Sequence, residues 1–214
     1  MKITYLISLI KLAVAFGWSN LAFGQNISAF VLENDVINHV KFEAKQISKI
    51  HVETVSSATF HFQSSAESTY KNDLYFDYRV ANDSLIITDI YPKYLEFGNN
   101  KMTSTQVFSV EVWFKLPENI NLFIDSNYAS MEIEGTFENL ILNTKSGNCK
   151  LNILKTNANI STYSGNINVI TTDVIVSAET QNGRLEIDTF LIERYPLKLK
   201  SIDGDIRVIN KRND

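Results

Sequence analysis

Apolar residues in the second half of the chain recur in four columns placed at fixed distances from a repeated small residue. That residue is, in turn, Ala129, Gly147, Gly165, Gly183 and Gly204, at intervals of 18, 18, 18 and 21 residues. The columns lie seven and five positions before it and two and four positions after it, and all twenty positions are apolar. Because residues two apart in a strand point to the same face, each unit is predicted to be two short strands joined by a corner.

The corner has its own signature, because a hydroxyl residue stands three positions before each small residue. These residues are Ser126, Thr144, Thr162, Thr180 and Ser201. Glycine reaches positive φ without a Cβ clash, and a Ser or Thr hydroxyl can bond the backbone two residues on. We therefore predict structural turns at Gly147, Gly165, Gly183 and Gly204, and a different backbone conformation at Ala129.

Units of this size cannot bury a core alone, so they are expected to stack with their apolar columns continuous. The predicted fold is all-β: a single-domain parallel β-solenoid, or β-helix. We expect about five regular 18-residue coils over 117–210 and less regular strands over 25–116. An antiparallel sandwich also accepts alternating strands but gives no reason for the constant interval. In the solenoid, Cys149, Ile167 and Leu185 should lie over one another.

The first half lacks the strict period but also predicts strands. Alternation, β-branched residues and aromatic residues indicate strands at 49–55, 59–63, 74–80, 84–89 and 107–116. The stretch 36–45 is a weak helix candidate.

The beginning of the chain resembles a secretory signal peptide. Residues 1–24 contain Lys2 and Lys11 and no acid, an apolar run over 12–16, and a small-x-small end at 22–24. We expect cleavage before Gln25, export to the periplasm or cell surface, and one domain over 25–214. An uncleaved membrane anchor is the alternative, although the interrupted apolar stretch is short for a full span. After cleavage no integral membrane span is expected.

Charge and cysteine usage narrow the possible partners. The net charge is −4, and loss of Lys2 and Lys11 makes it −6. A mildly acidic protein is not expected to bind nucleic acid or anionic lipid. The single cysteine, Cys149, shares an inward column with Met131 and Ile167, which predicts a packed core thiol rather than a nucleophile or metal ligand.

The repeat segments carry a family resemblance. The sequences SGNCKLNI, SGNINVI, QNGRLEI and DGDIRVI follow a strand ending in KLPENINLFIDSN. This pattern resembles the bacterial putative-adhesin solenoids, exported domains common in Bacteroidetes whose relatives include head GIN domains. The resemblance covers 107–210 well and 42–89 loosely. It implies a solenoid fold and an adhesin-like surface role, and it supplies no catalytic residue.

An enzyme remains the alternative, since parallel β-helices include polysaccharide lyases and hydrolases. Such chemistry needs converging carboxylates or a calcium site with a base. Glu132 and Glu186 are expected to lie three units apart. The three histidines, His39, His51 and His61, precede the repeats, and His51 and His61 have no Cys or acid partner at ligand spacing. Catalytic motifs such as G-x-S-x-G and H-E-x-x-H are missing from the sequence. We therefore predict no catalytic residue, no metal and no cofactor.

Exposed aromatic residues offer a possible ligand surface. Tyr91, Tyr94 and Phe97 lie in an aromatic loop, and alternation places Trp113 opposite Val112 and Phe114. These rings could meet a glycan or a protein partner. The preferred interpretation is that they cap the wide end of the solenoid, because an open end exposes strand edges and core columns.

The main functional hypothesis is a non-catalytic exported protein with a binding or structural role in the envelope. The alternatives are a polysaccharide-degrading enzyme and a periplasmic accessory protein that docks another envelope component. The expected partner is a glycan or an envelope protein, and the sequence does not predict an oligomeric state.

Overall fold

The computed structural model describes residues 26–33, 36–67, 75–90 and 109–212. These ranges contain strands and turns and no helix, so none of their segments is a helix able to cross a membrane. The expected signal peptide at 1–24 and the aromatic loop residues Tyr91, Tyr94 and Phe97 lie outside the described residues.

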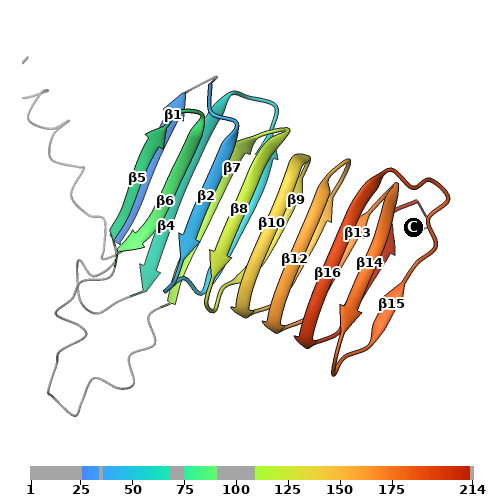
Figure 1. Ribbon diagram of the computed structural model, residues 1–214. Helices are drawn as coiled ribbons and strands as arrows, with labels where there is room; N and C mark the ends of the chain where they lie inside the picture. Colours follow the sequence, from blue (N-terminus) through green and yellow to red (C-terminus); the bar gives the residue numbers. More distant parts are fainter. Residues whose placement is uncertain (1–25, 34–35, 68–74, 91–108, 213–214) are drawn as a thin grey trace, which may run out of the picture.

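The described strands form two sheets that face each other around one hydrophobic core (Figure 1). The first, sheet A, runs in the order β1 (Asn26–Glu33), β4 (Thr59–Glu67), β7 (Ser109–Pro117), β3 (Lys49–Val55), β9 (Ser130–Gly135), β11 (Cys149–Ile153), β13 (Ile167–Thr171), β17 (Ile206–Asn210) and β15 (Leu185–Ile187). The second, sheet B, runs in the order β14 (Val174–Thr180), β16 (Tyr195–Asp203), β12 (Asn157–Ser164), β10 (Phe137–Ser146), β8 (Ile120–Ser126), β2 (His39–Ala44), β6 (Ser84–Ile90) and β5 (Tyr75–Ala81).

The pairing confirms an all-β, solenoid-like fold. Each repeat contributes one strand to sheet B and the next to sheet A, and equivalent strands of neighbouring repeats pair in parallel with matching registers, as for Leu140 with Ala158 and Cys149 with Ile167. Parallel pairing does not hold throughout, because β1–β4, β4–β7 and β5–β6 are antiparallel. The sheets are therefore mixed, with their antiparallel strands at the N-terminal end of the stack.

The expected strands of the first half are present as β3, β4, β5, β6 and β7, but the helix candidate over 36–45 is wrong. His39–Ala44 is strand β2, in which Val40, Phe42 and Ala44 are buried and the residues between them are not. A segment this short has no strong helical preference of its own. Its alternating apolar residues are buried because β2 lies between β6 and β8.

The order of the layers corrects the prediction that repeats stack as they follow in sequence. Strands β16 and β17 of the fifth repeat lie between those of the third and the fourth, so Ile167 pairs with Ile206, and Leu185 lies beyond Ile206. After β13 the chain leaves the next layer position open and forms β14 and β15 one layer further on. Strands β16 and β17 then occupy the open position. This return accounts for the longer interval of 21 residues before Gly204, since the segment 188–194 leads back toward the inserted layer.

This order exposes part of the core at the C-terminal end of the stack. Leu185 and Ile187 occupy columns that are buried elsewhere, yet 48% and 44% of their surfaces are exposed. In the neighbouring layer, Ile206 and Val208 are buried. The exposure follows from position, because the β14–β15 layer has a neighbour on one side only.

The opposite end of the stack is covered by aromatic rings. Phe30 of β1 stacks on Tyr78 of β5 with ring centroids 4.3 Å apart, so the two outermost strands of the sheets meet there. Beneath them Phe62 contacts Phe30, Phe76 and Phe114. These residues cap that end of the stack. Trp113, which was expected to join the cap, instead alternates with buried Val112 and Phe114 on β7. Whether the loop at 91–97 adds to the cap stays a prediction, because the loop lies outside the described residues.

The four glycines lie at corners between strands of the two sheets, where close approach of the backbones gives a physical reason for glycine. Gly147 has a φ of 129°, in the region that side chains avoid. A Cβ at Gly147 would also collide with the carbonyl of Ala129 in the neighbouring layer. The same collision, with the glycine one layer before, would occur at Gly165, Gly204 and Gly183. Ala129 begins this series and is not among the residues with positive φ.

Side chains at the corners also bond along the stack. Thr144 donates its hydroxyl to the carbonyl of Ser146, two residues on as predicted, whereas Thr180 donates to Gly204 of the next layer. The residues after Gly147, Gly165 and Gly204 continue this ladder, because their side-chain oxygens accept hydrogen bonds from the backbone of the next layer. Asn148 accepts from Asn166 N–H, Asn166 accepts from Asp205 N–H, and Asp205 accepts from Arg184 N–H.

We predict that Gly165→Ala destabilises the protein by about 1–3 kcal/mol or more, because its Cβ would meet the carbonyl of Gly147. The measurement is urea unfolding followed by circular dichroism. Ser164→Ala is the matched control, since Ser164 is exposed and directly precedes the glycine, and it should change stability by less than about 0.5 kcal/mol. Equal stability of the two variants would contradict the close-approach argument.

Cys149 is a fully buried thiol, as predicted, and burial raises its pKa to about 12. Because the thiolate is the reactive form, we expect no reaction with an aromatic disulfide reagent at pH 8 in the native protein. One thiol per chain should react once the protein is unfolded in denaturant. Rapid labelling of the native protein would show that this part of the core opens readily.

Candidate functional site

The outer face of sheet A holds a groove of about 410 Å³ that includes Trp113. We call it the Trp113 groove and define it by its aromatic and charged lining residues, which are His51, Glu53, Trp113, Lys115, Glu132, Glu134 and Lys150. These residues come from β7, β3, β9 and β11, which are consecutive in the sheet. Each alternates with buried neighbours such as Val112 and Phe114, so the strand period directs the groove residues outward, as predicted for Trp113.

Parallel pairing arranges the outward residues in rows that cross the strands. One row runs through Trp113, His51, Glu132, Lys150, Asn168, Arg207 and Glu186. Glu132 and Glu186 are thus four layers apart, not three, because Arg207 of the inserted layer lies between them. These two carboxylates do not converge on a common point.

An aromatic pair and an acid form the most ordered part of the groove. The imidazole of His51 is parallel to the indole of Trp113, with centroids 5.5 Å apart and an interplanar angle of 1°. His51 Nδ1 lies 3.2 Å from Glu132 Oε2, and Lys49 Nζ lies 3.8 Å from Glu132 Oε1. The half-buried indole is therefore held in place by its neighbours, and the accessible part of the ring can stack on a ligand.

A second row of the groove brings two carboxylates side by side, at Glu53 and Glu134. Each already has a polar partner. Lys115 Nζ lies 3.4 Å from Glu53, and Asn152 donates to Glu134 at 2.9 Å. The arrangement is one of surface ion pairs and hydrogen bonds, and no group of three His, Cys, Asp or Glu residues able to hold a metal occurs in the described part of the chain.

The structure brings Trp113 together with residues that the sequence reasoning left apart. His51 has no Cys or acid partner at ligand spacing in the sequence, but in space Glu132 lies beside it. His39 likewise lies 3.5 Å from Asp83. No signal in the sequence marks the contact of His51 with Trp113 and Glu132. Strand β3 pairs with β7 and β9, and β3 and β7 lie before the 18-residue repeats, so the repeat interval does not predict these pairings.

The remaining predicted site residues do not join the groove. Gly147, Gly165, Gly183 and Gly204 lie at the corners, where they allow the layers to approach. Whether Tyr91, Tyr94 and Phe97 belong to a ligand surface stays a prediction, since they lie outside the described residues.

Fold and surface together define a solenoid-like all-β protein with rows of outward side chains and an aromatic groove. Residues 98–214, more than half of the chain, match the Toastrack DUF4097 family, and the chain belongs to that family. The predicted resemblance to putative-adhesin solenoids is confirmed at the level of family and fold. No curated protein matches the chain significantly.

Solved structures that match this chain include two bacterial proteins of low sequence identity. A Clostridium sporogenes protein described as a "putative cell adhesion protein" has 14% identity and a TM-score of 0.64, over 88% of this chain and 100% of that chain. A Bacteroides fragilis "putative adhesin" has 11% identity and a TM-score of 0.33, over 86% of this chain and 97% of its own. The first likeness shows the fold alone, and the second is too distant to carry an argument.

We predict that the charges of the groove contribute little to stability, because exposed ion pairs contribute about 0–1 kcal/mol. Glu53→Gln and Glu132→Gln should each shift the free energy of unfolding by less than about 1 kcal/mol, measured by urea unfolding. A loss of several kcal/mol would show that these carboxylates are structural and are not available for binding.

Proposed function

We propose that this chain is a non-catalytic, exported protein of the bacterial cell envelope that binds a glycan or an envelope protein through the outer surface of its stacked sheets. In this proposal residues 1–24 are a signal peptide, and residues 25–214 act as one domain, with the regular coils of 117–210 extending the irregular strands of 25–116. The protein functions in the periplasm or at the cell surface.

The observation that carries the proposal is the Trp113 groove. Trp113 and His51 present a fixed aromatic surface on a sheet whose backbone is hydrogen-bonded along the whole stack. A preorganised aromatic surface binds without a large loss of conformational entropy. Charged groups of both signs, such as Lys150 and Glu134, surround it and can bond the hydroxyl and carboxyl groups of a glycan or the polar rim of a protein.

The adhesin-like role is also supported by the comparisons. The Clostridium sporogenes structure, which is described as a "putative cell adhesion protein", is consistent with a surface function. A polysaccharide-degrading role is less well supported, because Glu53 and Glu134 are occupied by Lys115 and Asn152.

The test measures binding and turnover together. The purified mature protein is titrated with neutral and acidic polysaccharides by calorimetry, while the same mixtures are assayed for new reducing ends and unsaturated products. Binding without products is the expected result. Products that increase with time would overturn the non-catalytic proposal in favour of a lyase or hydrolase. The absence of binding to every polysaccharide would contradict a glycan ligand and favour docking to an envelope protein.

We predict that Trp113→Ala weakens ligand binding at least about tenfold, because buried aromatic anchors dominate binding energy. Lys150→Ala, at an exposed groove position, should weaken binding without affecting folding. Tyr128→Ala is the matched control, since this ring is 61% exposed and does not line the groove. If Trp113→Ala and Lys150→Ala both bind as the wild type does, the groove is only structural.

A further inference from the structure

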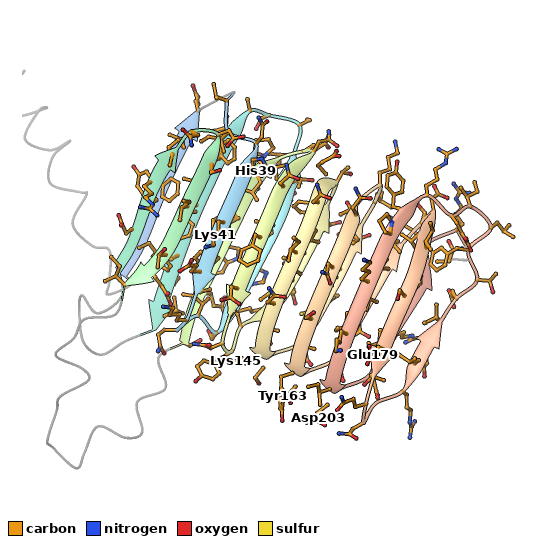
Figure 2. The ribbon with its side chains drawn as sticks, viewed as in Figure 1. His39, Lys41, Lys145, Tyr163, Glu179 and Asp203 are labelled. Carbon is orange, nitrogen blue, oxygen red and sulfur yellow. The ribbon has the colours of Figure 1, made fainter. Side chains whose placement is uncertain are left out.

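A second groove, of about 550 Å³, follows the rim of sheet B beside the glycine corners. Lysine side chains are its main charged groups, and we call the set Lys45, Lys145, Lys200 and Tyr163 the lysine corner. Figure 2 shows Lys145, Tyr163 and Asp203 following one another along this rim. The lysine corner lies on the opposite sheet from the Trp113 groove, so the two surfaces are separate.

The charge of this groove is opposite to that of the whole chain. Three lysines and one acid, Asp125, line it, whereas the complete chain has a net charge of −4. The Trp113 groove, in contrast, is lined by three glutamates and two lysines. The lysine corner is thus a local positive region on an acidic protein, which favours an anionic ligand.

The ammonium groups of the corner are largely uncommitted among the described residues. Neither Lys45 nor Lys145 forms an ion pair there, and Lys200 lies 3.6 Å from Glu179 in an exposed pair. Of the nearby acids, Glu43 is held by Lys41 at 2.7 Å, and Asp89 is buried and accepts a bond from the backbone of Gln46. Asp125 lines the groove beside Glu43 in the strand register and forms no ion pair with a described residue. The Lys45 ammonium acts on Glu43 and Asp89 through space without an ion pair, so Lys45 and Lys145 can both contact a ligand.

The groups of the corner are regularly spaced along the stack. Asn127 donates to the carbonyl of Lys45, and Lys145 follows Asn127 in the next layer, so the two lysines are two layers apart, or about 9.6 Å at ~4.8 Å per layer. Tyr163 lies one layer after Lys145. Lys200 lies one layer further on, where it is aligned with Ser161, two residues before Tyr163. A linear array of this kind fits a linear polymer with repeated charges.

Neutral groups between the lysines add a second kind of recognition. The ring of Tyr163 is 60% exposed, and the short polar residues Asn143 and Ser161 line the groove between the charges. An exposed ring stacks on the C–H face of a sugar, while amides and hydroxyls bond its hydroxyl groups. A polymer that offers carboxylates, hydroxyls and flat C–H faces in regular repetition is an acidic polysaccharide.

We propose that the lysine corner is a binding site for a linear acidic polysaccharide that lies along the stack axis. The carboxylates of the polysaccharide pair with Lys45, Lys145 and Lys200, and one of its sugar rings stacks on Tyr163. This site is independent of the Trp113 groove, so it can exist whether or not that groove binds a ligand.

The experiment uses polygalacturonate oligomers and their fully methyl-esterified form, which has the same backbone without the charge. Binding to the mature protein is measured by calorimetry at low salt. The acid form should bind and the ester form should bind at least about tenfold more weakly, and binding of the acid form should weaken as ionic strength rises. Equal binding of both forms, or binding of neither, would overturn the proposal.

Variants locate the site. Lys45→Glu combined with Lys145→Glu should weaken binding of the acid form at least about tenfold, and Tyr163→Ala should weaken it for both forms where the ester is measurable. Lys198→Glu combined with Lys211→Glu is the matched control, because it changes the net charge by the same amount and both lysines are exposed and do not line the groove. Equal losses in the double variant and in the control would show diffuse electrostatic attraction and overturn the site.

Two further measurements separate this proposal from others. Trp113→Ala should bind polygalacturonate as the wild type does, and loss of binding in that variant would assign the ligand to the Trp113 groove instead. Vesicles of phosphatidylglycerol test the lipid surface as another source of anions. Stronger binding to vesicles than to polygalacturonate, lost in the double lysine variant, would make the corner a membrane-docking surface and overturn the polysaccharide assignment.

Discussion

The close approach of neighbouring backbones at the glycine corners is the constraint on which the stack depends. Each layer hydrogen-bonds to the next directly through the corner, as where Gly147 N–H donates to Ser164 and Cys149 N–H donates to Asn166. The carbonyl of the preceding layer occupies the space that a Cβ would need. At Gly147, Gly165, Gly204 and Gly183 the lack of a side chain allows this close approach, and the apolar columns then meet at strand spacing.

A stack built in this way has two unlike ends. At the N-terminal end, antiparallel strands and the contact between Phe30 and Tyr78 bring the two sheets together. At the C-terminal end, the β14–β15 layer leaves Leu185 and Ile187 partly exposed. An antiparallel end changes the direction of the chain and breaks the regular repeat, which explains why the first half shows strands but no constant interval.

The same parallel register that forms the core also arranges the surface. Outward residues of equal position form rows, so side chains from strands far apart in sequence become neighbours. The Trp113 groove and the lysine corner are two such sets, on opposite sheets and of different charge. A rigid backbone with exchangeable outward residues can carry several binding surfaces without any change to the core.

The sequence by itself determined the local elements of this protein. The 18-residue interval, the apolar columns and the S/T-x-x-G corners depend on the strand period and on glycine geometry, which act within a few residues. The expected strands of both halves and the buried state of Cys149 followed from them. The helix candidate over 36–45 failed because the buried alternation of β2 depends on strands β6 and β8, which come later in the chain.

Only the tertiary structure decided which layers are neighbours. The insertion of β16–β17 before β14–β15, the pairing of His51 with Trp113 and Glu132, and the gathering of Lys45 with Lys145 all depend on contacts between distant segments. Every repeat presents equivalent edges and equivalent apolar columns, so local pattern does not distinguish one stacking order from another. The order is set by the length of the connections and by the packing of the whole stack.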